Sequence, residues 1–256
     1  MKDRALVAVV VVTLGSVLSV CQGAAKVQHR DNTWVLENER LEVEVHAPSG
    51  RISVRDKNAA YTWRQPTARA AAATDRFRNV ERLPGPQHGI SFETNVTTRG
   101  SRTLRLNVKM TVPEVNADVI FEVDATARHV PIDSFVCFDP LVLDAPKACL
   151  ALSAHGDGLL IDATDMSWRG RRYSFYGGPR LDMPWIGLTD MSKGYICLME
   201  TADDGAIVLR DVLAGGRKTL APQVRWRDSK GAFRYPRKWR YRFCATGGYV
   251  ALAKSY

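Results

Sequence analysis

The stretch from Leu41 to Arg55 reads LEVEVHAPSGRISVR. Apolar residues alternate with charged or polar ones in residues 41–45, and they do so again in residues 51–55. Such alternation is typical of a strand with one buried face, because successive side chains of a strand point to opposite faces. Gly50 precedes the second run, where the chain has to turn. The stretch therefore predicts an antiparallel hairpin whose two strands share one apolar face.

The same kind of pattern recurs through the rest of the chain. Short alternating or apolar runs are separated by Gly, Pro, Asp and Asn, and the one internal helical signal is residues 68–75, which we expect to be a short connector. Helical stretches of the length that parallel βαβ units need do not separate the runs. We therefore predict an all-β fold, one large antiparallel β-sandwich. The expected strands are 41–45, 51–55, 104–110, 119–123, 135–143, 159–162, 194–200, 206–210, 219–226 and 237–244.

The composition agrees with a globular β domain. The chain has 256 residues, of which 45% are hydrophobic and 25% charged. These values exclude a disordered, collagen-like or multi-span membrane protein. The formal net charge of +9 arises from 36 Lys and Arg against 27 Asp and Glu, and it indicates an anionic partner or surface.

The N-terminus has the layout of a secretory signal peptide. A charged start, residues 1–4, precedes an apolar run, residues 5–20, and the small residues of segment 21–25 follow. We predict a signal peptide over residues 1–23, with cleavage after Gly23 or Ala25, and hence an exported protein, either secreted or periplasmic.

Two alternatives for the N-terminus stay open. A permanent membrane anchor is disfavoured, because the apolar run is short and lacks a basic stop-transfer flank. A lipid anchor on Cys21 is suggested by the lipobox-like segment 18–21, although Val20 stands where that motif has Gly or Ala.

Four cysteines remain after the predicted cleavage, and each lies in an apolar, strand-like run. An exported protein can pair four cysteines in three ways, or it can bury them as free thiols that behave as small hydrophobes. Their spacing does not suggest a zinc site, and we expect neither a metal nor a cofactor. The four are Cys137, Cys149, Cys197 and Cys244.

Residues 168–204 are unusually rich in aromatic, acidic and Arg residues. A sugar presents hydroxyl groups and an apolar C–H face, so its site needs flat rings beside carboxylates and guanidinium groups. We expect Trp168 and Trp185 to stack on a sugar ring and Asp182 to accept hydrogen bonds from hydroxyls. The alternative is that the rings fill the core and the acids cap turns. The candidate carbohydrate-binding residues are Trp168, Arg172, Tyr176, Asp182, Trp185, Asp203 and Asp204.

No catalytic residue is assigned from the sequence. The common hydrolase, metalloprotease and nucleotide-binding motifs are missing. A glycosidase needs two carboxyl groups at a defined separation, which the sequence does not give. One alternative is a complete small sugar enzyme in which His155 works with Asp182 or Glu200 as acid and base.

Residues 234–243 interleave basic and aromatic side chains. As a strand, this segment places Trp239, Tyr241 and Phe243 on one face and Lys238, Arg240 and Arg242 on the other. Export argues against nucleic acid as the partner of such a face. The basic face either binds an anionic polysaccharide of the cell envelope or is simply solvated.

Three parts of the sequence carry a resemblance to a known family. They are 34–38 with 41–43, 50–57 and Trp63; 182–190 with 194–195 and 200–204; and 242–243 with 247–250 and 253–256. These parts resemble the N-terminal β-sandwich of secreted glycoside hydrolases, among them the endo-α-N-acetylgalactosaminidase-like enzymes. The resemblance implies a galactose-mutarotase-like supersandwich that precedes a (β/α)8 catalytic barrel, and it implies that the catalytic carboxylates lie on that barrel.

The C-terminal residues 249–256 have helical spacing, with apolar residues at positions 249, 252 and 253. The resemblance makes this segment the start of a linker helix to a catalytic domain encoded downstream and missing here, whereas a frayed tail is the alternative. We therefore expect a signal peptide (1–23), a sandwich domain (24–248) and a helix start (249–256). The expected function is an exported, carbohydrate-binding domain of glycoside-hydrolase type that takes oligo- or polysaccharide and is non-catalytic alone. It is either a truncated remnant of a longer enzyme or a stand-alone module.

Overall fold

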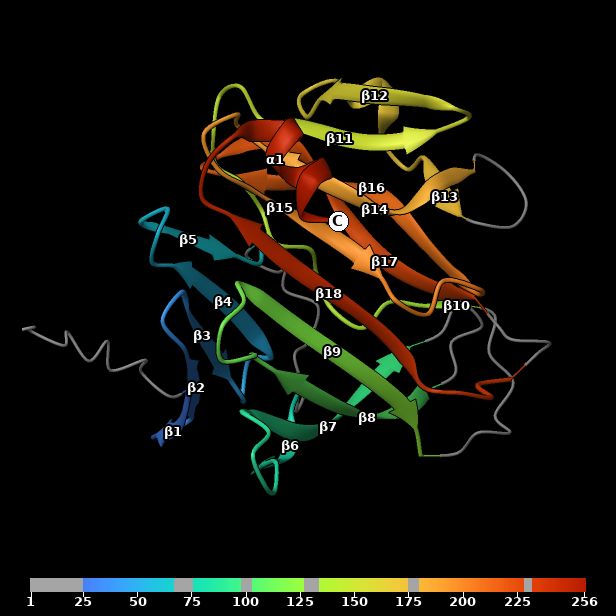
Figure 1. The fold of residues 1–256 in the computed structure, drawn as a ribbon. Helices are drawn as coiled ribbons and strands as arrows, with labels where there is room; N and C mark the ends of the chain where they lie inside the picture. Colours follow the sequence, from blue (N-terminus) through green and yellow to red (C-terminus); the bar gives the residue numbers. More distant parts are fainter. Residues whose placement is uncertain (1–24, 67–75, 98–102, 127–133, 175–179, 228–231) are drawn as a thin grey trace, which may run out of the picture.

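The computed structural model describes residues 25–66, 76–97, 103–126, 134–174, 180–227 and 232–256. In these ranges the chain forms three antiparallel sheets and a C-terminal helix, which confirms the all-β prediction (Figure 1). The predicted signal peptide and the helical signal at residues 68–75 lie outside the described residues. Within the described ranges no helix is both long and apolar enough to cross a membrane.

The five-stranded sheet contains the predicted hairpin. Leu41–His46 (β3) pairs with Arg51–Asp56 (β4), and Val43 lies opposite Val54 with both side chains buried. Gly50 has a φ of 63°, the left-handed backbone conformation that glycine adopts without strain. The strand order is β1 to β5, with β1 at Lys26–Arg30, β2 at Thr33–Glu37 and β5 at Tyr61–Arg64.

The other two sheets form the body of the sandwich. The nine-stranded sheet has the order β12-β11-β14-β15-β18-β9-β8-β7-β6, and the four-stranded sheet has the order β10-β17-β16-β13. The first comprises Arg78–Arg82 (β6), Gly89–Thr97 (β7), Thr103–Thr111 (β8), Asp118–Ala125 (β9), Cys149–Ala154 (β11), Asp157–Asp162 (β12), Leu181–Thr189 (β14), Gly194–Met199 (β15) and Arg237–Cys244 (β18). The second comprises Ser134–Phe135 (β10), Arg172–Ser174 (β13), Gly205–Ala214 (β16) and Arg217–Arg227 (β17).

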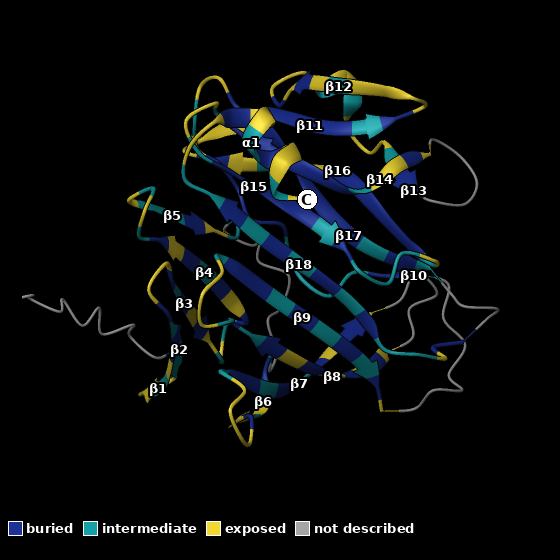
Figure 2. Cartoon of the chain, viewed as in Figure 1, coloured by how far each residue is buried: buried dark blue, intermediate teal, exposed yellow. Residues whose placement is uncertain are grey.

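One aromatic core joins all three sheets. Trp239 of β18 stacks on Phe121 of β9 with a centroid separation of 4.9 Å, and it lies 6.2 Å from Trp226 of β17. Trp63 of the five-stranded sheet meets Tyr195 of β15 edge to face at 5.1 Å. The buried stretches run along the strands of each sheet in Figure 2. Because these rings contact one another across sheet boundaries, the sheets share a core.

The strand expected over residues 135–143 is wrong beyond Phe135. Pro140 has no N–H to donate to a ladder, and side chains rather than a neighbouring strand satisfy several carbonyl groups of this segment. The donors are Gln223 Nε2 to the Phe138 carbonyl at 3.5 Å, Gln65 Nε2 to the Asp139 carbonyl at 3.0 Å and the Tyr195 hydroxyl to the Leu141 carbonyl at 2.7 Å.

The C-terminal segment forms the helix that its spacing predicts. Gly248–Ser255 (α1) lies against β14, β15 and β18. Leu252 is fully buried beneath the helix, and its Cδ1 lies 2.6 Å from the position that a Cβ on Gly187 would take. The missing side chain of Gly187 therefore makes the space into which Leu252 packs.

The four cysteines of the described chain are free. Cys149 and Cys197 are buried, and Cys137 and Cys244 are partly buried. Of the two alternatives that the sequence left open, the structure has the buried thiols rather than disulfides.

Candidate functional site

The structure does not gather the predicted sugar-binding residues into one site. Trp185 on β14 is 4% exposed and packs with Ala151, Ile196 and Leu252 between the nine-stranded sheet and α1. Stacking of a sugar on its ring would require α1 to leave. Tyr176 lies outside the described residues.

Asp182 supports a turn. Its carboxylate accepts hydrogen bonds from the Ser153 hydroxyl at 3.1 Å and from the Gly156 N–H at 2.8 Å, so it holds the turn between β11 and β12. His155 is an exposed residue of that turn, with a φ of 59°. The acid–base pair of His155 with Asp182 would therefore have to act on an exposed hairpin.

Asp204 forms an ion pair with the buried side chain of Arg237. Its Oδ2 accepts from the Tyr235 hydroxyl at 2.5 Å and from Arg237 at 3.2 Å, and the Arg237 side chain is fully buried. The Arg237 guanidinium also lies 3.5 Å from the centroid of the Tyr235 ring. Burial lowers the pKa of Arg237, whereas burial and the hydrogen bond to Asp204 raise the pKa of Tyr235 to about 12. Asp203 is exposed beside this cluster.

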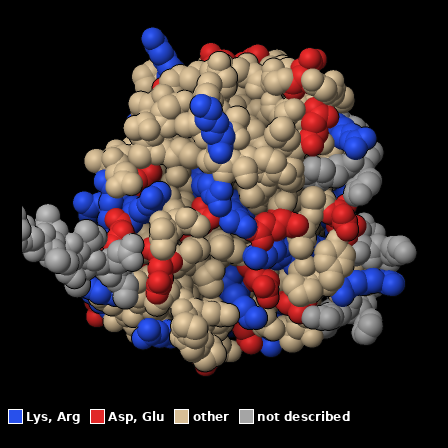
Figure 3. Space-filling view, viewed as in Figure 1, with Lys and Arg blue, Asp and Glu red and all other residues tan. Residues whose placement is uncertain are grey.

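The basic face of β18 is neutralised within the chain. The aromatic residues of this strand face the core and the basic residues face outward, as predicted. Lys238 and Arg240 form ion pairs with Glu200, and Arg240 and Arg242 do so with Asp118. Figure 3 shows acidic and basic side chains intermingled on this face of the molecule. The face therefore offers little unbalanced charge to a polyanion.

Trp168 and Arg172 lie elsewhere, beside a long groove that the sequence did not reveal, and neither of them lines the groove itself. The groove has a volume of about 1330 Å³ and is bounded by the four-stranded sheet, by the ends of β7 and β8, and by residues 136–140. Its polar lining residues are Gln65, Arg76, Arg78, Thr94, Asn95, Thr97, Thr103, Cys137, Asp139, Arg169, Arg210, Asp211, Lys218, Gln223 and Arg225.

The register of the four-stranded sheet explains the polar wall. Arg172, Val208 and Gln223 are mutual partners across β13, β16 and β17, so they form a row on one face. Because side chains alternate, Arg210 and Arg225 lie on this same face. The opposite face carries core residues such as Trp226. The alternation of side chains along β16 and β17 thus places core residues on one face of the sheet and groove residues on the other.

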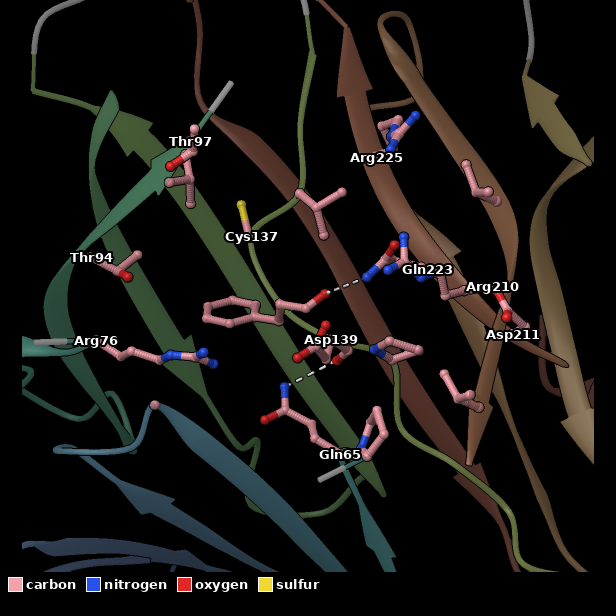
Figure 4. A pocket seen from close by; sticks show the side chains of 18 of the residues that line it. Gln65, Arg76, Thr94, Thr97, Cys137, Asp139, Arg210, Asp211, Gln223 and Arg225 are labelled. Carbon is pink, nitrogen blue, oxygen red and sulfur yellow. Dashed lines mark hydrogen bonds between the residues drawn. The ribbon is translucent and has the colours of Figure 1, made fainter. Parts of the chain in front are cut away.

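The facing wall is built around Arg76. The backbone of Gly50 lies directly against the Cβ, Cγ and Cδ atoms of Arg76, where a side chain at position 50 would collide. Figure 4 shows Arg76 extending from the β7 side toward the segment that carries Asp139. Gln65 fixes that segment, since it accepts from the Ile52 N–H and donates to the Asp139 carbonyl.

A smaller hollow adjoins the groove. We call it the arginine hollow; it is lined by Gly170, Arg171, Arg172, Val208 and Arg225. The Arg171 guanidinium lies 4.1 Å from the centroid of the Trp168 ring, a cation–π contact. Arg225 lines both spaces, and its Nε is buried without a hydrogen-bond partner among the described residues.

The groove is polar and basic rather than acidic. Asp139 and Asp211 are the carboxylates among its described lining residues, and Asp211 is ion-paired with Arg169 at 3.0 Å. Burial raises the pKa of the Cys137 thiol, which keeps that group neutral. In the described part of the chain, no three His, Cys, Asp or Glu residues are placed to hold a metal ion. The arrangement can bind hydroxyl and anionic groups through amides and guanidinium groups.

Sequence reasoning missed most of this groove because its walls come from distant segments. The detectable signal was the alternation in the second half of β17, where Gln223, Arg225 and Arg227 alternate with Val224 and Trp226. Polar and basic residues at that period predict a polar sheet face. Without the position of residues 136–140, the sequence does not show that this face borders a cavity.

The architecture is that of the large β-sandwich found in glycoside hydrolase structures, as the sequence resemblance implied. The chain is similar to alpha-N-acetylgalactosaminidase NagBb from Bifidobacterium bifidum. A quadruple mutant of that protein gives a TM-score of 0.64 at 19% identity, over 87% of this chain and 38% of that chain. Its GalNAc complex gives 0.62 at 18% identity, over 90% and 38%.

An alpha-mannosidase from Enterococcus faecalis V583 is also similar, with a TM-score of 0.55 at 11% identity, over 88% of this chain and 30% of that chain. The chain thus spans well under half the length of these enzymes. No protein-family model matches the sequence, and no curated protein matches it. The likenesses establish the fold.

Proposed function

We propose that this chain is a carbohydrate-binding β-sandwich domain and that the groove is its saccharide site. The observation that carries the proposal is the groove itself, whose volume of about 1330 Å³ exceeds that of most small-molecule pockets. Amide, hydroxyl and guanidinium groups line it from two walls, and these are the groups that bind sugar hydroxyls. The GalNAc complex of NagBb, a structure of the same fold, supports a sugar as the ligand class.

Binding without catalysis fits the groups in the groove. Glycoside hydrolysis ordinarily requires two carboxyl groups, one of which must be free to act as nucleophile or base. The Arg169 partner of Asp211 stabilises that carboxylate as a structural anion. We propose that hydrolysis of the bound glycan belongs to a separate catalytic domain, whether joined to this one or not.

Trp168 and Arg172 are retained in this proposal. Both lie next to the groove, Arg172 in the arginine hollow and Trp168 beneath Arg171. Trp168 is partly exposed, so one edge of its ring is available to a sugar that extends out of the hollow. Trp185, by contrast, contributes to the attachment of α1.

The test is calorimetric titration of the purified mature chain with a panel of neutral and acidic oligosaccharides. We expect saturable binding that Gln223→Ala weakens about tenfold, because Gln223 both lines the groove and donates to the Phe138 carbonyl at its base. Gln28→Ala, on β1 of the five-stranded sheet, is the matched control and should leave affinity unchanged. No binding to any member of the panel would refute the proposal.

We also propose that residues 1–23 export the protein, which would bring the groove into contact with extracellular or periplasmic glycans. N-terminal sequencing of the protein from the exported fraction tests this: a start at Ala24 or Lys26 is expected. Intact Met1 on cytosolic protein would contradict export.

A further inference from the structure

We propose that the arginine hollow binds an anionic substituent, a carboxylate or a sulfate, on the saccharide held in the groove. The inference rests on the proposed function, because it assigns the class of glycan to the same site. It predicts that the domain selects acidic over neutral oligosaccharides.

The walls of the groove and of the arginine hollow are mainly basic. The described residues that line the groove and the hollow include eight basic side chains and two carboxylates, and one of these carboxylates is already paired. Arg171, Arg172 and Arg225 line the hollow, and the structure shows no ion pair of these three with a carboxylate of the described residues, although Asp165 lies near enough for Arg171 to lower its pKa. Like charges placed together repel, so an anion between them removes an unfavourable interaction.

Arg225 has a side-chain nitrogen without a hydrogen-bond partner among the described residues. Its Nε is buried and has no hydrogen-bond partner among the described residues, although buried polar groups are nearly always paired. A guanidinium group presents Nε and a terminal nitrogen in a fork that matches two oxygens of a carboxylate or sulfate. A ligand anion in the hollow would accept hydrogen bonds from the terminal nitrogens of Arg225, and a small shift of the side chain would bring its buried Nε to the same anion.

Contacts within the chain fix the residues on either side of Gly170, so the hollow is formed before a ligand binds. Arg169 is drawn to Asp211 at 3.0 Å, and Arg171 lies over the Trp168 ring at 4.1 Å. The Gly170 N–H donates to the Leu209 carbonyl at 2.8 Å, which fixes the connection between these two residues to β16. A pre-formed site binds more tightly than one that must be ordered by its ligand.

The basic residues of β18 differ from those of the arginine hollow in having acidic partners. Lys238, Arg240 and Arg242 also form a basic row, yet each has an acidic partner from its own chain. At the hollow, by contrast, the structure shows no ion pair of Arg171, Arg172 or Arg225 among the described residues. The basic side chains of the hollow are therefore less neutralised by their own chain than those of β18.

Matched pairs of oligosaccharides test the inference by calorimetry. One pair is a galacturonic acid tetrasaccharide and its neutral methyl ester, and the other is a sulfated galactose tetrasaccharide and its unsulfated form. We expect the acidic member of at least one pair to bind about tenfold more tightly than its neutral twin, the usual scale of a charge-assisted contact. The pair that shows the difference identifies carboxylate or sulfate as the group.

Two variants locate the effect. Arg225→Met should remove the preference, and Arg210→Gln, an exposed position that folding does not depend on, should reduce it about threefold. Arg55→Met removes the same charge from β4, where the side chain is 61% exposed, and should leave the preference intact.

Equal affinity for both members of each pair, or equal losses in Arg55→Met and Arg225→Met, would overturn the inference while leaving saccharide binding in place. The absence of binding by all four oligosaccharides would instead count against the proposed function.

Discussion

The fully buried guanidinium of Arg237 donates to the partly exposed carboxylate of Asp204 at 3.2 Å. This contact ties the turn before β16 to the start of β18, and so it connects the four-stranded sheet to the nine-stranded one. The sequence suggests that Asp203 and Asp204 bind a sugar, but in the structure Asp204 is the counterion of Arg237.

Replacement of Asp204 by Ala is therefore expected to destabilise the fold, because Arg237 would keep its buried charge without a counterion. Loss of one partner of a fully buried pair costs about 3–5 kcal/mol, and we expect about 2–3 kcal/mol here since Asp204 is 22% exposed. Urea unfolding measures this. Asp203→Ala, at the exposed neighbouring position, should change the free energy of unfolding by less than about 0.5 kcal/mol. Equal effects of the two variants would contradict the structural role of Asp204.

Leu252 is expected to attach α1 to the sheet. Leu252→Ala should cost about 2–4 kcal/mol, because it opens a cavity beside Gly187 and Trp185. A red shift of Trp fluorescence should accompany the loss as water reaches the indole of Trp185. Val250→Ala, on the exposed side of the same helix, is the control, and it should alter neither quantity measurably. An unchanged emission spectrum in Leu252→Ala would show that the helix stays bound without this contact.

The turn between β14 and β15 is expected to respond to acid. Burial tends to raise the pKa of Asp190, but hydrogen bonds from Lys193 and Ser192 outweigh it and lower the pKa to about 2 from the ordinary value of 3.8. A depressed folded-state pKa contributes stability that is present above pH 3.8 and lost as the pH falls through about 2. The stability difference between wild type and Asp190→Asn should therefore be constant at neutral pH and shrink between pH 4 and pH 2. Urea unfolding at several pH values measures it; a difference that grows as the pH falls would contradict the assignment.

Gly50 is expected to matter for both stability and binding. Gly50→Ala forces a side chain into the left-handed region and against Arg76. Gly85→Ala imposes the same kind of strain, with a φ of 73°, but has open space around it. We expect about 1–2 kcal/mol of destabilisation for Gly85→Ala and more for Gly50→Ala. Only Gly50→Ala should also weaken saccharide binding, since Arg76 lines the groove. If the two variants bind saccharide with equal affinity, Arg76 is not part of the binding site.

The parts of the fold that could be predicted are those in which apolar and polar residues alternate along a strand. The hairpin of β3 and β4 and the two faces of β18 follow from period-two patterns, which depend on local sequence alone. Residues 136–143 have the sequence pattern of a strand, but the strand ends at Phe135. Several carbonyl groups of these residues accept hydrogen bonds from the side chains of remote residues such as Gln65 and Gln223. Such long-range hydrogen bonds leave no local signal.

The site was harder to predict than the fold. Trp185 and Trp168 belong to the same aromatic-rich segment, and composition does not distinguish them. Trp185 is buried because α1, more than sixty residues later in the sequence, returns to cover it, whereas Trp168 is the last residue of a short 3-10 helix, Met166–Trp168, at the surface. The groove itself is assembled from residues 65–66 after β5, from β7 and β8, from residues 136–140, and from β16 and β17, so its shape depends on topology rather than on any one motif.

A crystal structure of the chain with a bound acidic oligosaccharide would show where the saccharide lies. We expect saccharide density in the groove, with the acidic substituent within hydrogen-bond distance of Arg225 and a ring near Gln223 and Asp139. Density confined to another surface, such as the exposed turn at Asp182 or the β18 face, would contradict the assignment of the site.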